Sequence, residues 1–413
     1  MRRRHLLALP PALAIAACTG TTPGPSASTP QDPEGTTGPV SDGDGAPSAP
    51  GESKETTAAP STPPPGPWES SAQVTALLEQ LTNAEIAGQL VMVGITAGSD
   101  VPPQTLAEQH VGGFFLLDIW RDPDQVDGTV ATMNEGARPE LPPLIAVDQE
   151  GGQVRMLRGE AARRTPSAEE LGASGPDAVR EAYTSIGEDL VARGIAVALS
   201  PVADVVDPDL GNGNEPVGAL DRGFGTDPEA VAACVVAAVE ALEEAGTAAT
   251  LKHFPGLGRV EQNTDHSAAG IRDDTTTAED PFLESFRAGI EAGAELVMLS
   301  SATYTLLDDT QPAMFSQAVV TDLLREQLGF EGLAVTDDIG AAKAVAEVPV
   351  ADRATRFLDA GGDVVLTADP SISGELVEAI LQWGARGERE QERVRASAAR
   401  MLTLKERRGL VGS

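Results

Sequence analysis

Eight short apolar runs, separated by helix-like segments, constrain the fold of this chain more than any other feature. Continuous apolar strands that alternate with helices indicate a parallel sheet with both faces covered, and eight such units predict an α/β fold of the (β/α)8 TIM-type barrel. No glycine-rich dinucleotide fingerprint follows any run, which disfavours the alternative, a doubly wound open sheet. The runs lie at residues 91–95, 112–117, 143–148, 196–205, 247–254, 295–302, 332–338 and 361–368.

Two of the intervening segments carry clear helix signals. Residues 228–246 follow Asp227, which suits an N-cap, and they end on glycine, as a helix C-cap does. Residues 315–329 also end on glycine, and both segments are predicted to be helices. Cys234 lies among apolar residues of the first segment, so we interpret it as a small buried side chain rather than a nucleophile.

The amino-terminal part of the chain differs in composition from the rest. Residues 1–18 combine Arg2–Arg4, an apolar stretch and a small-residue end, which is the pattern of an export signal. The ending resembles a bacterial lipobox and implies cleavage before Cys18 and lipid on its thiol; the alternative is an ordinary signal peptide. Residues 19–68 are almost all Thr, Pro, Gly, Ser, Ala, Asp and Glu, so we expect a disordered tether. The barrel domain is predicted over 70–413.

Charge and motif content disfavour several classes of partner. The formal net charge is −34, whereas nucleic-acid binding needs clustered Lys and Arg. The four histidines and two cysteines form no HExxH or CxxC pattern, so no metal is expected. The chain also lacks a GxSxG elbow and a GxxxxGK loop, and no cofactor is expected.

Polar side chains end several of the predicted strands. The active site of a parallel barrel lies at the carboxyl ends of its strands, so we expect these groups to converge on one mouth. They are Asp148, Asp204, Lys252, His253, Ser300, Ser301, Asp337 and Asp338.

Each candidate also has a structural interpretation. Asp148 precedes a Gly-Gly pair and either faces a ligand or caps a turn. Arg222 lies in a loop, as many surface arginines do. Lys252 can donate to hydroxyls or form a Schiff base, and His253 can be a satisfied structural histidine.

The adjacent Asp337 and Asp338 end the run at 332–338. A carboxylate at a strand end can attack an anomeric carbon, whereas its neighbour can cap the next helix. We expect one of the two to cap and the other to take part in chemistry.

Together these motifs resemble glycoside hydrolase family 3, in particular its single-domain β-N-acetylglucosaminidase branch. The resemblance rests on VDQEGGQV, SPVADV, DRGFGTDP, KHFPGLG, VMLSSATY and GFEGLAVTDD in that order. It implies a retaining exo-enzyme with a barrel fold. Many members carry a second domain, and the chain ends before one, which favours the named branch. The resemblance also implies that Asp337 is the nucleophile and that Asp148, Arg222, Lys252 and His253 bind hydroxyls of the terminal sugar.

The chain departs from the family pattern at two places. Met156 stands where the family has a substrate-contacting arginine, and Arg155 lies one residue early. The family's Asp-x-His triplet is matched by 263–265, with His266 one residue later. The acid/base is therefore either Asp265, which the ungapped match favours, or His266 oriented by Asp265 after a one-residue shift. A third alternative is a site with no efficient acid.

The leading hypothesis is an exported, lipid-anchored β-N-acetylhexosaminidase that faces the cell wall. It would remove terminal N-acetylglucosamine from peptidoglycan fragments or chitooligosaccharides. The alternatives are a non-catalytic saccharide-binding lipoprotein, a β-glucosidase-type hydrolase and a Schiff-base lyase using Lys252. The expected partners are a small saccharide and, through the lipid alone, a membrane. The sequence does not define whether water or phosphate is the acceptor, nor the oligomeric state.

Overall fold

The computed structural model describes residues 68–99, 108–264, 266–267 and 271–411. The predicted export signal, most of the predicted tether, the lipidation candidate Cys18 and the acid/base candidate Asp265 lie outside the described residues.

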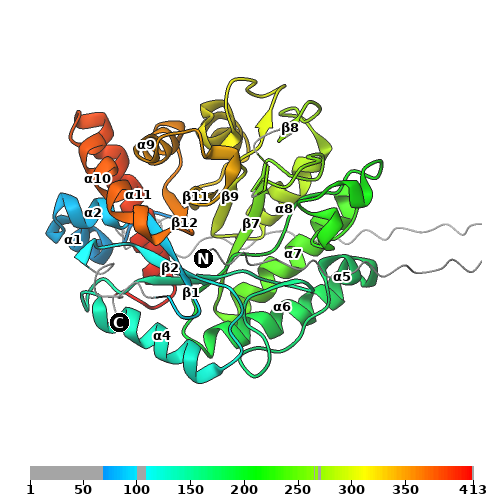
Figure 1. Ribbon diagram of the computed structural model, residues 1–413, viewed down its shortest axis with the longest axis horizontal. Coiled ribbons are helices and arrows are strands. Elements are labelled where there is room, and N and C mark those ends of the chain that lie inside the picture. The colour runs from blue at the N-terminus through cyan, green and yellow to red at the C-terminus, as the bar shows by residue number, and fades with distance from the viewer. Residues whose placement is uncertain (1–67, 100–107, 265, 268–270, 412–413) are drawn as a thin grey trace, which may run out of the picture. The chain divides into compact units, whose positions relative to one another are not determined.

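The centre of the described chain is a closed parallel barrel (Figure 1). Each strand pairs with the next barrel strand along the chain, and the last pairs with the first, in the order β1-β12-β11-β9-β7-β6-β3-β2. All eight predicted runs contain a barrel strand, which confirms the predicted (β/α)8 fold. The strands are β1 (Val91–Thr96), β2 (Gly113–Leu117), β3 (Leu144–Val147), β6 (Val197–Ala198), β7 (Ala248–Phe254), β9 (Leu296–Leu299), β11 (Leu333–Asp338) and β12 (Val364–Thr367).

Helices surround the barrel strands (Figure 1). They are α1 (Ala72–Gln80), α2 (Asn83–Gly88), α4 (Pro123–Gly136), α5 (Ala168–Ser174), α6 (Pro176–Val191), α7 (Pro228–Ala245), α8 (Glu284–Glu291), α9 (Val350–Ala360), α10 (Ser373–Gly384) and α11 (Glu388–Arg407). Short strands outside the barrel are β4 (Gln149–Gly151), β5 (Val154–Arg155), β8 (Arg272–Asp273) and β10 (Thr303–Tyr304). In the part of the chain that the structure describes, no helix has the length and apolar character needed to cross a membrane.

The helix predicted over 228–246 is confirmed as α7. The Asp227 carboxylate accepts a hydrogen bond from the backbone N–H of Ala230 at 2.9 Å and caps the helix. Gly246 ends it with a φ of 91°, a conformation that glycine adopts without steric cost. Cys234 is buried on this helix, as predicted.

The helix predicted over 315–329 is present with a different hydrogen-bond pattern. Its regular part, η5 (Ala318–Gln327), is a π-helix. At its end the backbone N–H of Leu328 donates to the carbonyl oxygen of Leu323, five residues earlier, at 2.9 Å. The apolar spacing that indicates a helix does not distinguish this wider turn from an α-helix.

The predicted strand at 196–205 is much shorter than its apolar run. Only β6 belongs to the barrel ladder as a regular strand. Pro201 has no N–H to donate, so the ladder is interrupted there, and pairing resumes at a single bridge between Val202 and Lys252. Beyond this bridge the backbone places Asp204 in the interior, where its side chain is fully buried.

Helix α11 packs at the amino-terminal end of the barrel. Its residues Met401 and Leu404 belong to the same buried cluster as Leu296, the first residue of β9. Arg407 pairs with Glu295, just before β9, at 2.7 Å, and its guanidinium lies 5.4 Å from the ring centroid of Trp68. The described chain therefore begins at the barrel end opposite the carboxyl ends of the strands.

Candidate active site

A cavity of about 520 Å³ opens at the carboxyl ends of the barrel strands. Its floor is apolar and includes Phe115, Leu199, Met298 and Leu366. Seven charged or titratable side chains line its wall and mouth: Asp148, Arg222, Lys252, His253, His266, Asp337 and Asp338. This bears out the expected convergence for most strand-end groups, whereas Asp204, Ser300 and Ser301 are buried and do not line the cavity.

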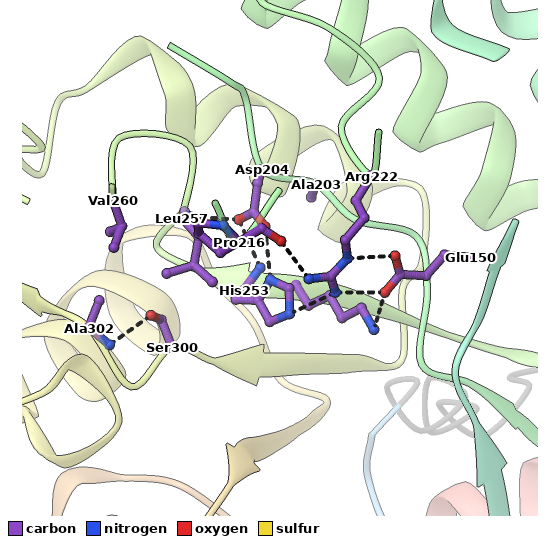
Figure 2. Close-up of polar contacts among 12 residues, drawn as sticks. Glu150, Ala203, Asp204, Pro216, Arg222, His253, Leu257, Val260, Ser300 and Ala302 are labelled. Carbon is purple, nitrogen blue, oxygen red and sulfur yellow. Dashed lines mark hydrogen bonds and ion pairs between the residues drawn. The ribbon is translucent and has the colours of Figure 1, made fainter. Parts of the chain in front are cut away.

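Glu150 on β4 joins the two cationic residues of the cavity wall. Its carboxylate accepts two hydrogen bonds from the Arg222 guanidinium, at 2.8 and 2.9 Å (Figure 2), and lies 2.7 Å from Lys252 Nζ. Burial by itself raises the pKa of Glu150, but the charges and hydrogen bonds of Arg222 and Lys252 outweigh it and lower the pKa to about 2. Glu150 is therefore ionised at neutral pH and fixes both cations.

Lys252 is held as an ammonium. Its Nζ lies 2.6 Å from an Asp148 oxygen and 2.7 Å from Glu150, and its side chain is almost fully buried. Burial by itself lowers the pKa of Lys252, and the carboxylates of Asp148 and Glu150 raise it above its ordinary value. A Schiff base needs a neutral amine, so this environment disfavours the lyase hypothesis.

His253 and its neighbours are fixed by Asp204 (Figure 2). One oxygen of the buried Asp204 carboxylate accepts from the backbone N–H groups of His253 and Leu257, both at 2.9 Å. The other oxygen lies 2.8 Å from His253 Nδ1. The peptide bond between Lys252 and His253 is cis, and both side chains line the cavity.

Asp337 and Asp338 at the end of β11 have different surroundings. Asp338 accepts hydrogen bonds from the backbone N–H groups of Gly340 and Ala341, each at 2.8 Å, and from that of Ala368 at 2.7 Å. Asp338 therefore holds the turn after β11 and does not cap the next helix as expected, because that helix, η6 (Lys343–Val345), has Ala342 at its N-cap and no side-chain cap. Asp337 lines the cavity and accepts from the backbone N–H of Asp338 at 2.8 Å.

The segment after β7 is anchored by a buried asparagine. Asn214 Nδ2 donates to the carbonyl oxygens of Leu257 and Val260, both at 2.7 Å, and Asn214 Oδ1 accepts from the backbone N–H of Gly218. This segment leads to His266, which lines the cavity. Asp265, the favoured acid/base candidate, lies outside the described residues.

Arg155 does not take the place of the missing arginine. Its Nε donates to the carbonyl oxygen of Gly152 at 2.9 Å, and it is not among the residues that line the cavity. Met156 does line the cavity. The chain therefore presents a thioether and not a guanidinium at this point of the wall.

Three residues that organise the site were not assigned a role from the sequence. The sequence identifies Asp204 only as a strand-end carboxylate, and it assigns no role to Glu150 or Asn214. Glu150 had a detectable signal, because it lies in the same strand-end motif as Asp148, just before two glycines. The two carbonyl partners of Asn214 lie more than 40 residues along the chain, and no local sequence pattern predicts them.

A parallel barrel with a polar cavity at its strand ends defines a barrel enzyme. The model of the glycosyl hydrolase family 3 N-terminal domain matches residues 82–404. The chain belongs to this family and is a glycoside hydrolase, as the motif resemblance implied.

Curated relatives and solved structures agree with this assignment. A β-hexosaminidase from Xanthomonas oryzae pv. oryzae is 37% identical over 284 residues, which cover 63% of this chain and 82% of the relative. One from Stenotrophomonas maltophilia is 38% identical over 306 residues, covering 70% and 87%. The crystal structure of a β-N-acetylhexosaminidase from Beutenbergia cavernae is 40% identical, with a TM-score of 0.76, and covers 79% of this chain and 99% of that one. A family 3 β-N-acetylglucosaminidase from Paenibacillus is 30% identical, with a TM-score of 0.71 and coverages of 81% and 64%.

Proposed function

We propose that this glycoside hydrolase removes terminal β-linked N-acetylglucosamine from cell-wall fragments or chitooligosaccharides. The observation that carries the proposal is the meeting of Asp337 with Asp148, Arg222, Lys252 and His253 around one cavity. Charged donors and acceptors of this kind can bind the hydroxyls of one sugar ring in a fixed orientation. The names of the relatives from Xanthomonas and Stenotrophomonas support a hexosamine as that sugar.

In the proposed reaction Asp337 attacks the anomeric carbon. The glycosidic bond breaks as the ester to Asp337 forms, and an acid protonates the leaving oxygen. Water, deprotonated by the same group, then attacks the anomeric carbon and releases Asp337, so the β configuration is retained. Asp265 is the favoured acid/base and His266 the alternative.

The test is turnover of N,N′-diacetylchitobiose, followed by NMR. We expect free N-acetylglucosamine with the β anomer formed first. Binding of the disaccharide without turnover would support the saccharide-binding alternative, and faster turnover of an aryl β-glucoside than of the matching N-acetylglucosaminide would support a β-glucosidase. Sugar 1-phosphate formed in phosphate buffer would identify phosphate as the acceptor.

Export and lipid anchoring through Cys18 are part of the proposal. They rest on the basic, apolar and small-residue pattern of residues 1–18. The described chain begins at Trp68, at the barrel end opposite the cavity.

A further inference from the structure

The hydrogen bonds of His253 define which ring nitrogen carries the proton. His253 Nδ1 lies 2.8 Å from Asp204 Oδ2. Asp204 Oδ1 accepts from two backbone N–H groups, which can only donate. An ionised carboxylate accepts hydrogen bonds only, so Nδ1 facing it must be the donor.

The contact on the opposite side of the ring independently indicates that Nε2 carries no proton. His253 Nε2 lies 3.4 Å from Arg222 Nη2 (Figure 2). A guanidinium has N–H donors and no acceptor, and Arg222 is paired with the buried Glu150. A proton on His253 Nε2 would point toward the N–H group of Arg222 and be repelled by it. A lone pair on Nε2 can instead accept a hydrogen bond from Arg222.

We propose that Asp204 is a positioning residue for the hydrolytic reaction, holding the neutral His253 imidazole with its proton on Nδ1 and its Nε2 as a hydrogen-bond acceptor in the cavity. His253 lines the cavity, and its contact with Arg222 Nη2 is long, at 3.4 Å. In the complex, a sugar hydroxyl takes the place of Arg222 as the donor to Nε2, and Nε2 does not donate. Lys252, its neighbour, offers only donors. His253 therefore binds a sugar hydroxyl that donates, and Lys252 binds a sugar hydroxyl that accepts.

Asp204 also fixes the backbone around this histidine. Its bonds to the N–H groups of His253 and Leu257 span the turn that follows β7. The carboxylate has no exposed surface, so no solvent molecule can replace these bonds without rearrangement. Orientation and tautomer of His253 are therefore set by one side chain.

The first measurement is the tautomer of His253 in the wild-type protein. The protein is labelled with 15N-histidine, and two-bond 1H–15N correlations are recorded at the pH of the activity assay. The chain has four histidines, and the signal that disappears in His253→Gln is that of His253. We expect the pattern of a neutral ring protonated on Nδ1. A ring protonated on Nε2, or on both nitrogens, overturns the proposal.

The second measurement uses Asp204→Asn, which keeps the shape of the side chain. Its oxygen can still accept from the two backbone N–H groups, but its NH2 group then faces His253 Nδ1. We expect the proton to move to Nε2 and kcat/KM for the chitobiose substrate to fall by about 100-fold. An unchanged tautomer or an unchanged kcat/KM overturns the proposal.

Asp273→Asn is the matched control. Asp273 is also buried and also accepts from two backbone N–H groups, those of Thr275 and Thr276, but it does not line the cavity. We expect it to change neither the His253 spectrum nor kcat/KM. The kinetic arm rests on the proposed function, whereas the wild-type spectrum needs no turnover and decides the tautomer by itself, once the folded His253→Gln variant has assigned the signal.

Discussion

At the scale of single residues, the two neighbouring carboxylates of β11 do different work. Asp338 is occupied by three backbone N–H groups, whereas Asp337 faces the cavity. We predict that a 5-fluoro glycosyl probe labels Asp337 and that Asp337→Ala lowers kcat by about 10⁴-fold or more. Mass spectrometry of the labelled peptide identifies the site. Asp338→Asn is the control and should still be labelled at Asp337; a label on Asp338, or an inverted first product, would refute the assignment.

The acid/base group can be identified from its effect on different leaving groups. An acid that protonates the leaving oxygen matters for poor leaving groups and hardly at all for good ones. We predict that Asp265→Ala cripples turnover of chitobiose, largely spares the first step with a dinitrophenyl glycoside and is rescued by azide. His266→Ala should show neither selectivity nor rescue.

The reverse pattern would assign the acid to His266, which lines the cavity. The loop would then carry an Asp–His pair displaced by one residue. If neither variant discriminates between the two leaving groups, no protein acid acts at this position, and the saccharide-binding alternative gains support.

At the scale of elements, the barrel strands were predictable because each is buried on both faces. A strand that is buried on both faces needs apolar residues at successive positions, so it appears as a continuous apolar run. All eight runs contain a barrel strand. The run at 196–205 predicts a strand in the right place but too long, because Pro201 interrupts the ladder. The π-helical pattern of η5 was not predictable, because its apolar spacing fits an α-helix as well.

The site residues at strand ends were predictable from the sequence, whereas the contacts between residues far apart in the chain were not. Asp148, Lys252, His253 and Asp337 each lie within the last three residues of a barrel run, so the fold alone brings them together. Glu150 acquires its role by contact with Arg222, 72 residues away. The strand-end motif marks Glu150 as a candidate, but its pairing with Arg222 is set by tertiary packing and has no local sequence pattern.

The segment after β7 depends on Asn214 for its position. Asn214→Ala removes two donors to the carbonyls of Leu257 and Val260 and an acceptor for Gly218. Leaving buried polar groups unpaired costs about 1–3 kcal/mol each, so we expect a lower urea midpoint and a lower kcat, because this segment leads to residues 265 and 266.

The control for Asn214 is a variant that loses stability at another element. Asp227→Ala removes the N-cap of α7 and should cost about 1 kcal/mol without changing kcat. If the two variants lower kcat equally at matched stability, Asn214 has no particular influence on the site.

At the scale of the whole molecule, the lipid anchor is a separate question from catalysis. We predict that Cys18→Ser releases the protein from the membrane fraction and leaves its specific activity unchanged, because the match to the family's domain begins only at residue 82. Fractionation followed by an activity assay checks both parts. A variant that stays with membranes, or a wild type found wholly in the medium, would contradict the anchor.

The stability of the protein should depend on pH because of one buried lysine on α11, at the amino-terminal end of the barrel. Lys405 is fully buried, and its Nζ donates to Gln89 Oε1 at 2.6 Å. Burial lowers the pKa of Lys405 from its ordinary value of 10.5 to about 7. Between these two pH values the unfolded chain binds the proton and the folded chain does not, so the free energy of unfolding rises with pH through this window.

Lys405→Met should flatten that rise. The loss of the donor to Gln89 lowers stability equally at all pH values, by about 1–3 kcal/mol, whereas the pH-dependent part disappears. From pH 6.5 to pH 9 the wild type should gain about 2 kcal/mol more than the variant in urea unfolding. Lys343 has an exposed side chain, so Lys343→Met should keep the wild-type rise. An equal rise in all three proteins would mean that Lys405 remains charged in the fold, with the neutral amide of Gln89 sufficient to hold an ammonium away from water.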